Sequence, residues 1–410
     1  MIVGKIQRIY REYPRNFWVV ISALFVDRLG GALIFPFIAL FITAKFAVGM
    51  TEVGQLFAVV AVTSVFGSMI GGALTDKFGR KTMIIFGLVV SAFTALLLGF
   101  VDNLDVIYVA GMVVGLFGNI GGPAQQAVIA DILPEEKRVD GFGLLRIVAN
   151  LAVTIGPAIG GVLATHSYLW LFILDAIASS ATAVIVLLAI PETKPQTREG
   201  DPPETLVQTL RGYWGVLGDG SFMAFILASV LMVSVYVQMN TTLPVYLRDV
   251  HGIPDQGYGY IISLNAGMVV LFQFWITRRI KHLPPMIVMA VGTLLFAFGF
   301  SMYGFVSTYV LFMFAMVIIT IGEMFVAPVG QALVAGFAPE HMRGRYMAMY
   351  GFSWTIPLAF SPWGAGVIAD NHSPYMVWYL CGVVSLIAIA GYLAMHFLRE
   401  VRFAEVSPKK

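Results

Sequence analysis

Ionisable side chains interrupt several otherwise apolar segments of this chain. They are Asp27, Arg28, Arg146, Asp175 and Glu323. A charge at the centre of a lipid bilayer costs at least about 2.5–3.5 kcal/mol, so each group must face a protein interior, pair with a partner or take up a proton. A carboxyl group in apolar surroundings can hold a proton at neutral pH and release it when a cation arrives. The chemistry predicted for these residues is therefore reversible protonation and cation binding.

Glu323 is the sharpest candidate for such a proton and substrate site. It lies in the middle of an apolar segment, five residues before Pro328. Its counterpart in an internal repeat, described below, is Gly118, so the two copies of the repeat differ at this point. The alternative is a structural acid that pairs with a basic or hydroxyl group.

The other four groups carry less specific predictions. Asp27 and Arg28 are adjacent and point about 100° apart on a helix, so they cannot neutralise each other face to face. Asp27 is expected either to be a second protonation site or to pair with Arg146, although Arg146 is near enough to the end of its segment to reach the membrane surface. Asp175 has either a structural role or a place on an outward proton path.

The segments that position these groups are apolar helices. Of the 410 residues, 59% are hydrophobic and 12% are charged, a balance that predicts an integral membrane protein. A helix needs about 20 residues to cross a bilayer, and the strands of a membrane barrel would alternate polar and apolar residues, which these runs do not. The sequence accommodates twelve spans, at 17–44, 53–74, 82–101, 106–131, 141–164, 168–190, 221–247, 257–280, 284–304, 308–337, 345–369 and 374–398.

The twelve spans fall into two copies of one unit. Residues 123–164 reappear at 328–369 after a shift of 205 positions, and eleven of the 42 aligned residues are identical. This duplication predicts two six-helix bundles related by a pseudo-two-fold axis along the membrane normal, with the substrate site between them. The expected domains are residues 1–190, a polar cytoplasmic linker at 191–220 with an amphipathic segment at 205–217, and residues 221–410.

Basic residues set the expected orientation. Most of the 25 Lys and Arg residues fall on one side of the membrane if both termini are cytoplasmic. We therefore expect a multi-pass protein of the cell (inner) membrane. Its basic residues are explained by membrane topology, and we expect no binding of nucleic acid. The single cysteine, Cys381, and the scattered histidines predict neither a disulfide framework nor a metal site.

The connection between the second and third spans has two glycines, an acid and two basic residues at fixed spacing: Gly72, Asp76, Gly79, Arg80 and Lys81. This pattern resembles the signature cytoplasmic loop of the major facilitator superfamily. The resemblance implies the fold of that superfamily and a cytoplasmic latch that stabilises the outward-open state, with Asp131 as the expected partner of Arg80. The alternative is that the basic residues only set topology. The second copy has Lys281 in place of Asp76, so the latch is expected in one half alone.

Two further motifs resemble the drug/proton antiporters of that superfamily, the twelve-span multidrug efflux type. The first is the exporter motif of the fifth span, formed by Asn150, Gly156, Pro157, Gly160 and Gly161. The second is the stretch 322–331 around Glu323. One departure is Gly111, where exporters of this family often carry an arginine. A generic kinked helix is the alternative reading of the exporter motif.

These features together predict a proton-coupled secondary active transporter that exports lipophilic, cationic drugs by alternating access. The alternative is a proton-coupled carrier of a specific metabolite or lipid. We expect no enzyme activity and no cofactor, because the chain has neither a catalytic cluster nor a nucleotide-binding loop and the proton gradient can supply the energy. The expected partners are small lipophilic substrates, protons and the lipid bilayer, and the expected state is a monomer.

Overall fold

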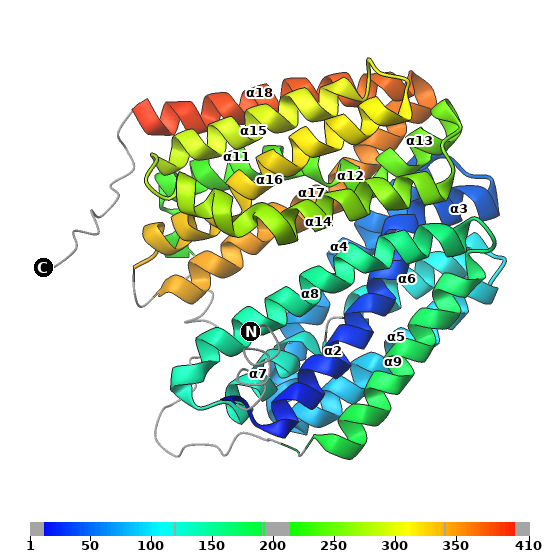
Figure 1. The fold of residues 1–410 in the computed structure, drawn as a ribbon, viewed down its shortest axis with the longest axis vertical. Coiled ribbons are helices and arrows are strands. Elements are labelled where there is room, and N and C mark those ends of the chain that lie inside the picture. The colour runs from blue at the N-terminus through cyan, green and yellow to red at the C-terminus, as the bar shows by residue number, and fades with distance from the viewer. Residues whose placement is uncertain (1–11, 119, 191, 193–213, 340–341, 398–410) are drawn as a thin grey trace, which may run out of the picture. The chain divides into compact units, whose positions relative to one another are not determined.

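The computed structural model is built from helices, as Figure 1 shows. It describes residues 12–118, 120–190, 192, 214–339 and 342–397. Within these ranges there is no strand, and ten helices are long and apolar enough to cross a membrane. The predicted all-helical membrane fold is confirmed, whereas the count of twelve spans stays a prediction.

Two predicted spans account for the difference in count. The predicted fourth span is divided, because α6 (Leu104–Gly118) has only 15 residues and α7 begins at Gly122, with a proline in its first turn. The predicted eleventh span is the 29-residue α17 (Arg343–Asn371), which contains Pro357 and Pro362 and is not among the ten. The predicted amphipathic segment of the linker begins outside the described residues.

The chain divides into two compact units, which we call unit 1 and unit 2. Unit 1 comprises Met1–Val48, Gln55–Thr197 and Gly252–Ala266, and unit 2 comprises Gly49–Gly54, Arg198–His251 and Gly267–Lys410. Unit 1 thus includes a short segment of the second sequence repeat, and unit 2 includes a short segment of the first. Those segments are the first turns of α4 (Met50–Phe78) and the first half of α14 (Asp255–Ile280).

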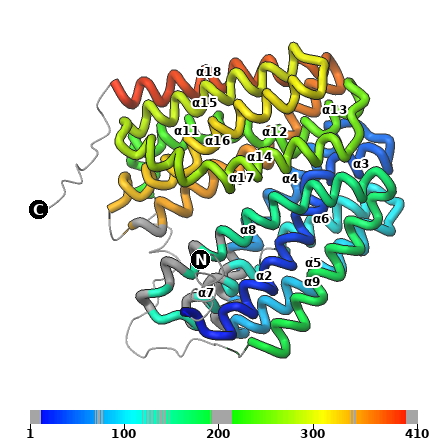
Figure 2. The backbone as a smooth tube through the Cα atoms, in the orientation of Figure 1, coloured from blue at the N-terminus to red at the C-terminus, as the bar shows by residue number. Residues whose placement is uncertain are grey.

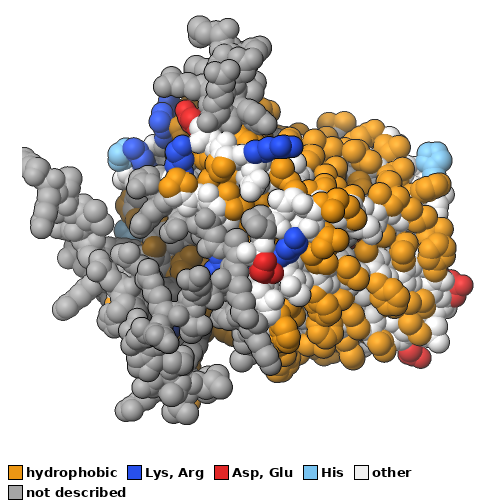
Figure 3. Space-filling model, turned by 90° about the horizontal axis from the view of Figure 1, so that it is seen from below, with side chains coloured by type: hydrophobic (Ala, Val, Ile, Leu, Met, Phe, Trp, Pro, Cys, Tyr) orange, Lys and Arg blue, Asp and Glu red, His pale blue; other side chains and the backbone are white. Residues whose placement is uncertain are grey.

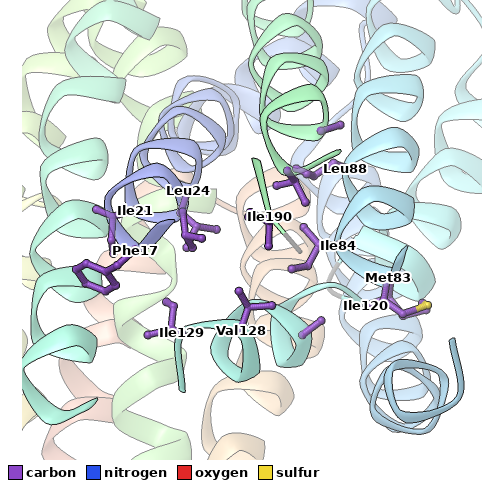
Figure 4. Close-up of a cluster of buried hydrophobic side chains, with 14 of the residues drawn as sticks. Phe17, Ile21, Leu24, Met83, Ile84, Leu88, Ile120, Val128, Ile129 and Ile190 are labelled. Atoms are coloured by element: carbon purple, nitrogen blue, oxygen red, sulfur yellow. The ribbon is translucent and has the colours of Figure 1, made fainter. Parts of the chain in front are cut away.

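Unit 1 is a bundle in which α2 packs against α8 and α9, while α5 packs against α6, α7 and α9 (Figure 2). A buried apolar cluster joins α2, α5 and α7, and the side chains labelled in Figure 4 belong to it. Phe17 and Ile129 are completely buried there. Besides α6 and α7, the elements are α2 (Arg15–Ile34), η1 (Phe35–Phe37), α3 (Ile38–Phe46), α5 (Arg80–Phe100), α8 (Glu135–Ala164) and α9 (Leu169–Ala189).

Unit 2 is a second bundle, in which α15 packs against α16 and α18, and α11 packs against α17 and α18. Aromatic rings fill its interior, and the Phe222 and Tyr346 ring centroids are 4.5 Å apart. Besides α17, its elements are α11 (Gly220–Tyr236), α12 (Gln238–Thr241), α13 (Leu243–His251), α15 (Pro285–Met302), α16 (Tyr309–Phe337) and α18 (Pro374–Phe397).

The surface of the molecule suits contact with lipid. On the face shown in Figure 3, hydrophobic side chains cover a broad area that few charged side chains interrupt. Large apolar side chains such as Phe93, Phe298 and Val310 are more than half exposed. Exposed apolar area of this extent would destabilise a protein in water, whereas hydrocarbon tails solvate it.

The N-terminus of α11 offers a test of the fold. The Asp219 carboxylate accepts hydrogen bonds from the Phe222 amide at 3.0 Å and from the Tyr346 hydroxyl at 3.0 Å. Replacing Asp219 with Ala removes a helix cap worth about 0.5–2 kcal/mol, so we expect a lower unfolding midpoint in detergent. Asp219→Asn, which keeps a capping oxygen, is the matched control and should lose less. Equal midpoints for Asp219→Ala and the parent protein would contradict this role.

Candidate functional site

Glu323 of α16 and Tyr236 of α11 form a polar pair inside unit 2. The two side chains are hydrogen-bonded, with the phenol as the donor to the carboxylate. Both residues are half-buried in helices that are otherwise apolar. The structure therefore gives Glu323 a hydroxyl partner, and this pair is the centre of the candidate site.

Aromatic rings from two further helices surround the Tyr236 ring. Its centroid is 5.7 Å from that of Phe296 on α15, and it is also 5.7 Å from that of Trp354 on α17, where the rings meet edge to face. Trp354 is in turn hydrogen-bonded to the Tyr350 hydroxyl. An acid that is hydrogen-bonded to a phenol within an aromatic cluster can attract a cation by its charge and through an accessible ring.

Proline chemistry places a second polar group next to Glu323. Pro328 has no amide hydrogen, so the carbonyl oxygen of Met324, four residues earlier, lacks its usual partner within the helix. The side-chain amide of Gln273 on α14 donates to that oxygen at 3.0 Å. The sequence analysis missed both Tyr236 as a partner of Glu323 and Gln273. The proline was the available signal for Gln273, because the carbonyl that a proline frees in an apolar helix needs a donor.

The predicted acids of unit 1 form a separate group. Asp27 of α2 interacts with its neighbour Arg28 and accepts a hydrogen bond from the Ser179 hydroxyl at 3.4 Å. Asp175 of α9 is close enough to Asp27 for the two carboxylates to repel each other. The side chain of Arg146 lies outside the described residues, so its pairing with Asp27 stays a prediction.

The cytoplasmic loop motif is anchored by a residue that the sequence analysis did not assign to it. Glu192 accepts hydrogen bonds from the amides of Arg80 at 2.8 Å and Lys81 at 3.2 Å, and it also accepts from Thr82. Gly79 makes this approach possible, because its φ is 93° and an added Cβ would lie 2.7 Å from the Glu192 carboxylate. The carboxylate thus caps the positive N-terminus of α5.

The remaining predictions for this motif involve side chains that are not described. These side chains belong to Asp76 and Asp131, so the expected pair of Arg80 with Asp131 is untested. The Lys81 ammonium donates to the Leu187 carbonyl at 2.7 Å, which ties the start of α5 to the end of α9. Gly72 also lies among the residues of which only the backbone is described. The latch function therefore stays a prediction.

The exporter motif on α8 uses two faces of the helix. Gly156 and Gly160 lie against α2 and η1. A Cβ added at Gly156 would be 2.5 Å from the Ala32 Cβ, and one added at Gly160 would be 2.8 Å from the Leu33 oxygen. Pro157 and Gly161 lie against the first half of α14. Asn150, six residues before Gly156, is half-buried, and its carbonyl accepts a hydrogen bond from the Thr154 hydroxyl at 2.8 Å.

The contact with α14 is a close approach of two backbones. A Cβ at Gly259 of α14 would lie 2.5 Å from the Pro157 oxygen and 3.2 Å from the Gly161 Cα. In unit 2 the copies of these residues make the equivalent contact: Gly54 of α4, which is Gly259 shifted by 205, lies against Pro362 and Trp363 of α17. There the Asp370 carboxylate also accepts from the Thr51 amide at 2.8 Å.

Comparison with known proteins agrees with this fold. The family model of the Major Facilitator Superfamily matches residues 20–362 and 256–410. The chain therefore belongs to the Major Facilitator Superfamily, and it is a multi-pass membrane transporter.

Curated relatives include transporters of different stated substrates. A "Na(+), Li(+), K(+)/H(+) antiporter" of Planococcus maritimus is 29% identical over 379 residues, which are 86% of this chain and 89% of that protein. The "Multidrug resistance protein MdtH" of Yersinia enterocolitica serotype O:8 / biotype 1B is 23% identical and covers 95% of this chain and 92% of its own length.

Solved structures show the same fold at low sequence identity. The crystal structure of the nucleoside transporter NupG has a TM-score of 0.80 at 14% identity, and it covers 93% of this chain and 99% of that chain. The peptide transporter POT in complex with sulfate has a TM-score of 0.77 at 15% identity, and it covers 94% of this chain and 95% of its own. At these identities the similarity establishes the fold alone.

The Glu192 cap predicts a local change in amide exchange. In Glu192→Ala the amides of residues 80–82 lose their acceptor, so their hydrogen exchange should become faster, and the cap's contribution of about 0.5–2 kcal/mol should be lost. Glu192→Gln keeps a neutral oxygen and should have a smaller effect. Mass-spectrometric hydrogen exchange measures both variants. Unchanged exchange at the start of α5 in Glu192→Ala would show that the carboxylate is not its cap.

The α8–α14 contact predicts intolerance of a single methyl group. Gly259→Ala forces the two backbones apart, and overpacking of this kind costs about 1–3 kcal/mol. We expect a lower unfolding midpoint and reduced transport. The matched control is Gly364→Ala on α17, where no atom lies within 4 Å of the new Cβ. A Gly259→Ala protein as stable and active as Gly364→Ala would exclude a close-contact role.

Proposed function

We propose that this transporter exports lipophilic cations in exchange for protons, with Glu323 as the group that binds each in turn. The observation that carries the proposal is the half-buried Glu323 carboxylate, hydrogen-bonded to Tyr236 in an apolar bundle. A carboxylate in such a place is costly unless a cation or a proton neutralises it. Competition between the two at one group is sufficient to couple their movements.

In the proposed cycle, ionised Glu323 binds a cationic substrate that enters from the cytoplasm. After the transporter opens outward, a proton from outside neutralises the carboxylate and the substrate leaves. The protonated form then returns and releases its proton into the cytoplasm. The proton gradient supplies the energy, and we propose no other cofactor.

The surroundings of Glu323 suit an apolar cation of variable shape. The rings of Tyr236 and Trp354 are half-buried or exposed and can attract positive charge, and such an interaction is worth about 0.5–2 kcal/mol. Met324, next to Glu323, packs in an apolar cluster with Ile276, Ile280 and Val288. A binding surface with one acid and several rings selects for charge and apolar area more than for an exact pattern of hydrogen bonds.

The resemblance of the motif on α8 to that of exporters supports export as the proposed direction of transport. We place the protein in the cell (inner) membrane with both termini in the cytoplasm, on the distribution of its basic residues. The names of the relatives support exchange of a cation for a proton in one case and drug resistance in the other. A carrier of one specific metabolite or lipid is the alternative that the experiments below would reveal.

Efflux of a fluorescent lipophilic cation tests the role of Glu323. Glu323→Gln keeps the size of the side chain but removes the charge, and a charge-assisted interaction worth about 1.5–3 kcal/mol corresponds to about 10- to 100-fold in apparent affinity. Tyr236→Phe removes a single hydroxyl and should cost about 2- to 10-fold. Both effects are measured as proton-dependent dye efflux from cells or from proteoliposomes with an imposed pH gradient.

The matched control is Asp102→Asn, which neutralises an exposed acid that pairs with Lys45 at 3.0 Å. This variant should export the dye as the parent protein does, because an exposed ion pair contributes little. Proton-dependent efflux by Glu323→Gln at the rate of the parent protein would refute the proposal. Transport of none of a panel of lipophilic cations, with uptake of a neutral metabolite instead, would favour the alternative.

A further inference from the structure

We propose that Asp27, Asp175 and Ser179 form a binding site for a small alkali cation, Na⁺ or Li⁺, between α2 and α9 of unit 1. This site is separate from Glu323, which belongs to unit 2. Asp175 and Ser179 are four residues apart on α9 and so share one face of that helix. The Ser179 hydroxyl contacts Asp27 of α2, which shows that this face is directed at Asp27.

The Asp175 carboxylate is buried, and no described residue donates a hydrogen bond to it. The residue is 7% exposed, and among the described residues it makes no hydrogen bond and no ion pair. One of its oxygens lies in a notch on α2 at Gly30, where an added Cβ would be only 2.5 Å away. Gly30 is one turn from Asp27, so the notch brings the two carboxylates to the same part of the helix surface. A buried acid beside a half-buried one, in an apolar helix bundle, calls for a neutralising cation or proton.

The spacing of the oxygen atoms fits a coordination shell of a small cation. The Ser179 Oγ is 3.4 Å from an oxygen of Asp27 and 3.5 Å from the Ser91 Oγ of α5. Na⁺ is about as large as Ca²⁺, whose oxygen ligands lie at about 2.3–2.6 Å, so adjacent oxygens of an octahedral shell are about 3.3–3.7 Å apart. These separations are long for hydroxyl hydrogen bonds, which have a mode of about 2.7–2.8 Å. The hydrogen bonds between these oxygens are therefore long, and their spacing matches that of neighbouring ligands of Na⁺.

The local charges select a monovalent ion. Among the side chains that the structure describes here, Asp27 and Asp175 contribute two negative charges, and Arg28, an exposed neighbour that interacts with Asp27, contributes one positive charge. One Na⁺, Li⁺ or proton brings this set to neutrality, whereas a divalent ion would leave an excess positive charge in the membrane. Among the described residues there is also no group of three acids, histidines or cysteines that could hold a metal. The ligands are hard oxygens, which suit alkali cations.

Thermal unfolding of the purified full chain in detergent tests the site. The ionic strength is held constant while NaCl or LiCl replaces choline chloride, since choline is too large for the site. A cation that binds the folded state raises the unfolding midpoint, and at a concentration well above its dissociation constant we expect a shift of about 2–4 °C. Asp175→Asn should abolish the shift. Ser179→Ala, which retains both acids, should weaken the apparent Na⁺ affinity about 3- to 10-fold.

Glu323→Gln keeps this test independent of the proposed drug site. It should retain the full Na⁺ shift, even if it exports dye normally and thereby refutes the proposal for Glu323. A parent protein that responds equally to Na⁺ and choline would overturn the cation site, as would an Asp175→Asn protein that still responds to Na⁺. A shift that Glu323→Gln abolishes and Asp175→Asn preserves would place the ion in unit 2 and also overturn it.

Discussion

An ionised side chain in an apolar bilayer must be neutralised, and the functional groups of this transporter are arranged around that constraint. Lys45, in the last turn of α3, has an ionic partner in the exposed Asp102, and its ammonium also donates to the Gly99 carbonyl at 3.2 Å. Glu323 lies inside the bundle, where its carboxylate accepts a hydrogen bond from the Tyr236 phenol. A phenol donates a hydrogen bond but carries no charge of its own. We propose that a transported cation or a proton balances the charge of the carboxylate during the cycle.

Close backbone contacts fix the positions of neighbouring helices within each unit. Gly259 lies against Pro157 and Gly161 in unit 1, and its repeat counterpart Gly54 lies against Pro362 in unit 2. The two contacts are related by the same shift of 205 residues that relates the sequence copies. The copies therefore agree at this contact, and they differ at Glu323, whose counterpart is Gly118.

Much of this organisation could be predicted from the sequence, because it depends on composition, on the length of apolar runs and on the internal repeat. Apolar runs of span length predicted the helices, and the loop around Gly79 predicted the superfamily. The sequence also singled out Glu323 and Asp27, since a charge in an apolar run is visible without a structure. The break between α6 and α7 was missed because the glycines at 121 and 122 also occur inside membrane helices.

The partners of these groups could not be predicted, because one sequence does not show which helix faces which. Tyr236 is 87 residues before Glu323, and Glu192 follows Arg80 by 112 residues. The proximity of the Asp175 and Asp27 carboxylates likewise depends on the packing of α9 against α2. Gln273 is a partial exception. Pro328 predicts that the carbonyl four residues earlier needs a hydrogen-bond donor, but the sequence does not show which residue supplies it.

Proton release on substrate binding tests the central claim most directly. Purified transporter in a weakly buffered solution, at a pH where the protonated form of Glu323 predominates, is mixed with a lipophilic cation such as tetraphenylphosphonium, and the released protons are counted with a pH indicator. The account predicts about one proton per bound cation, and none from Glu323→Gln. Tight binding of the cation by the parent protein without proton release, or equal release from Glu323→Gln, would contradict it.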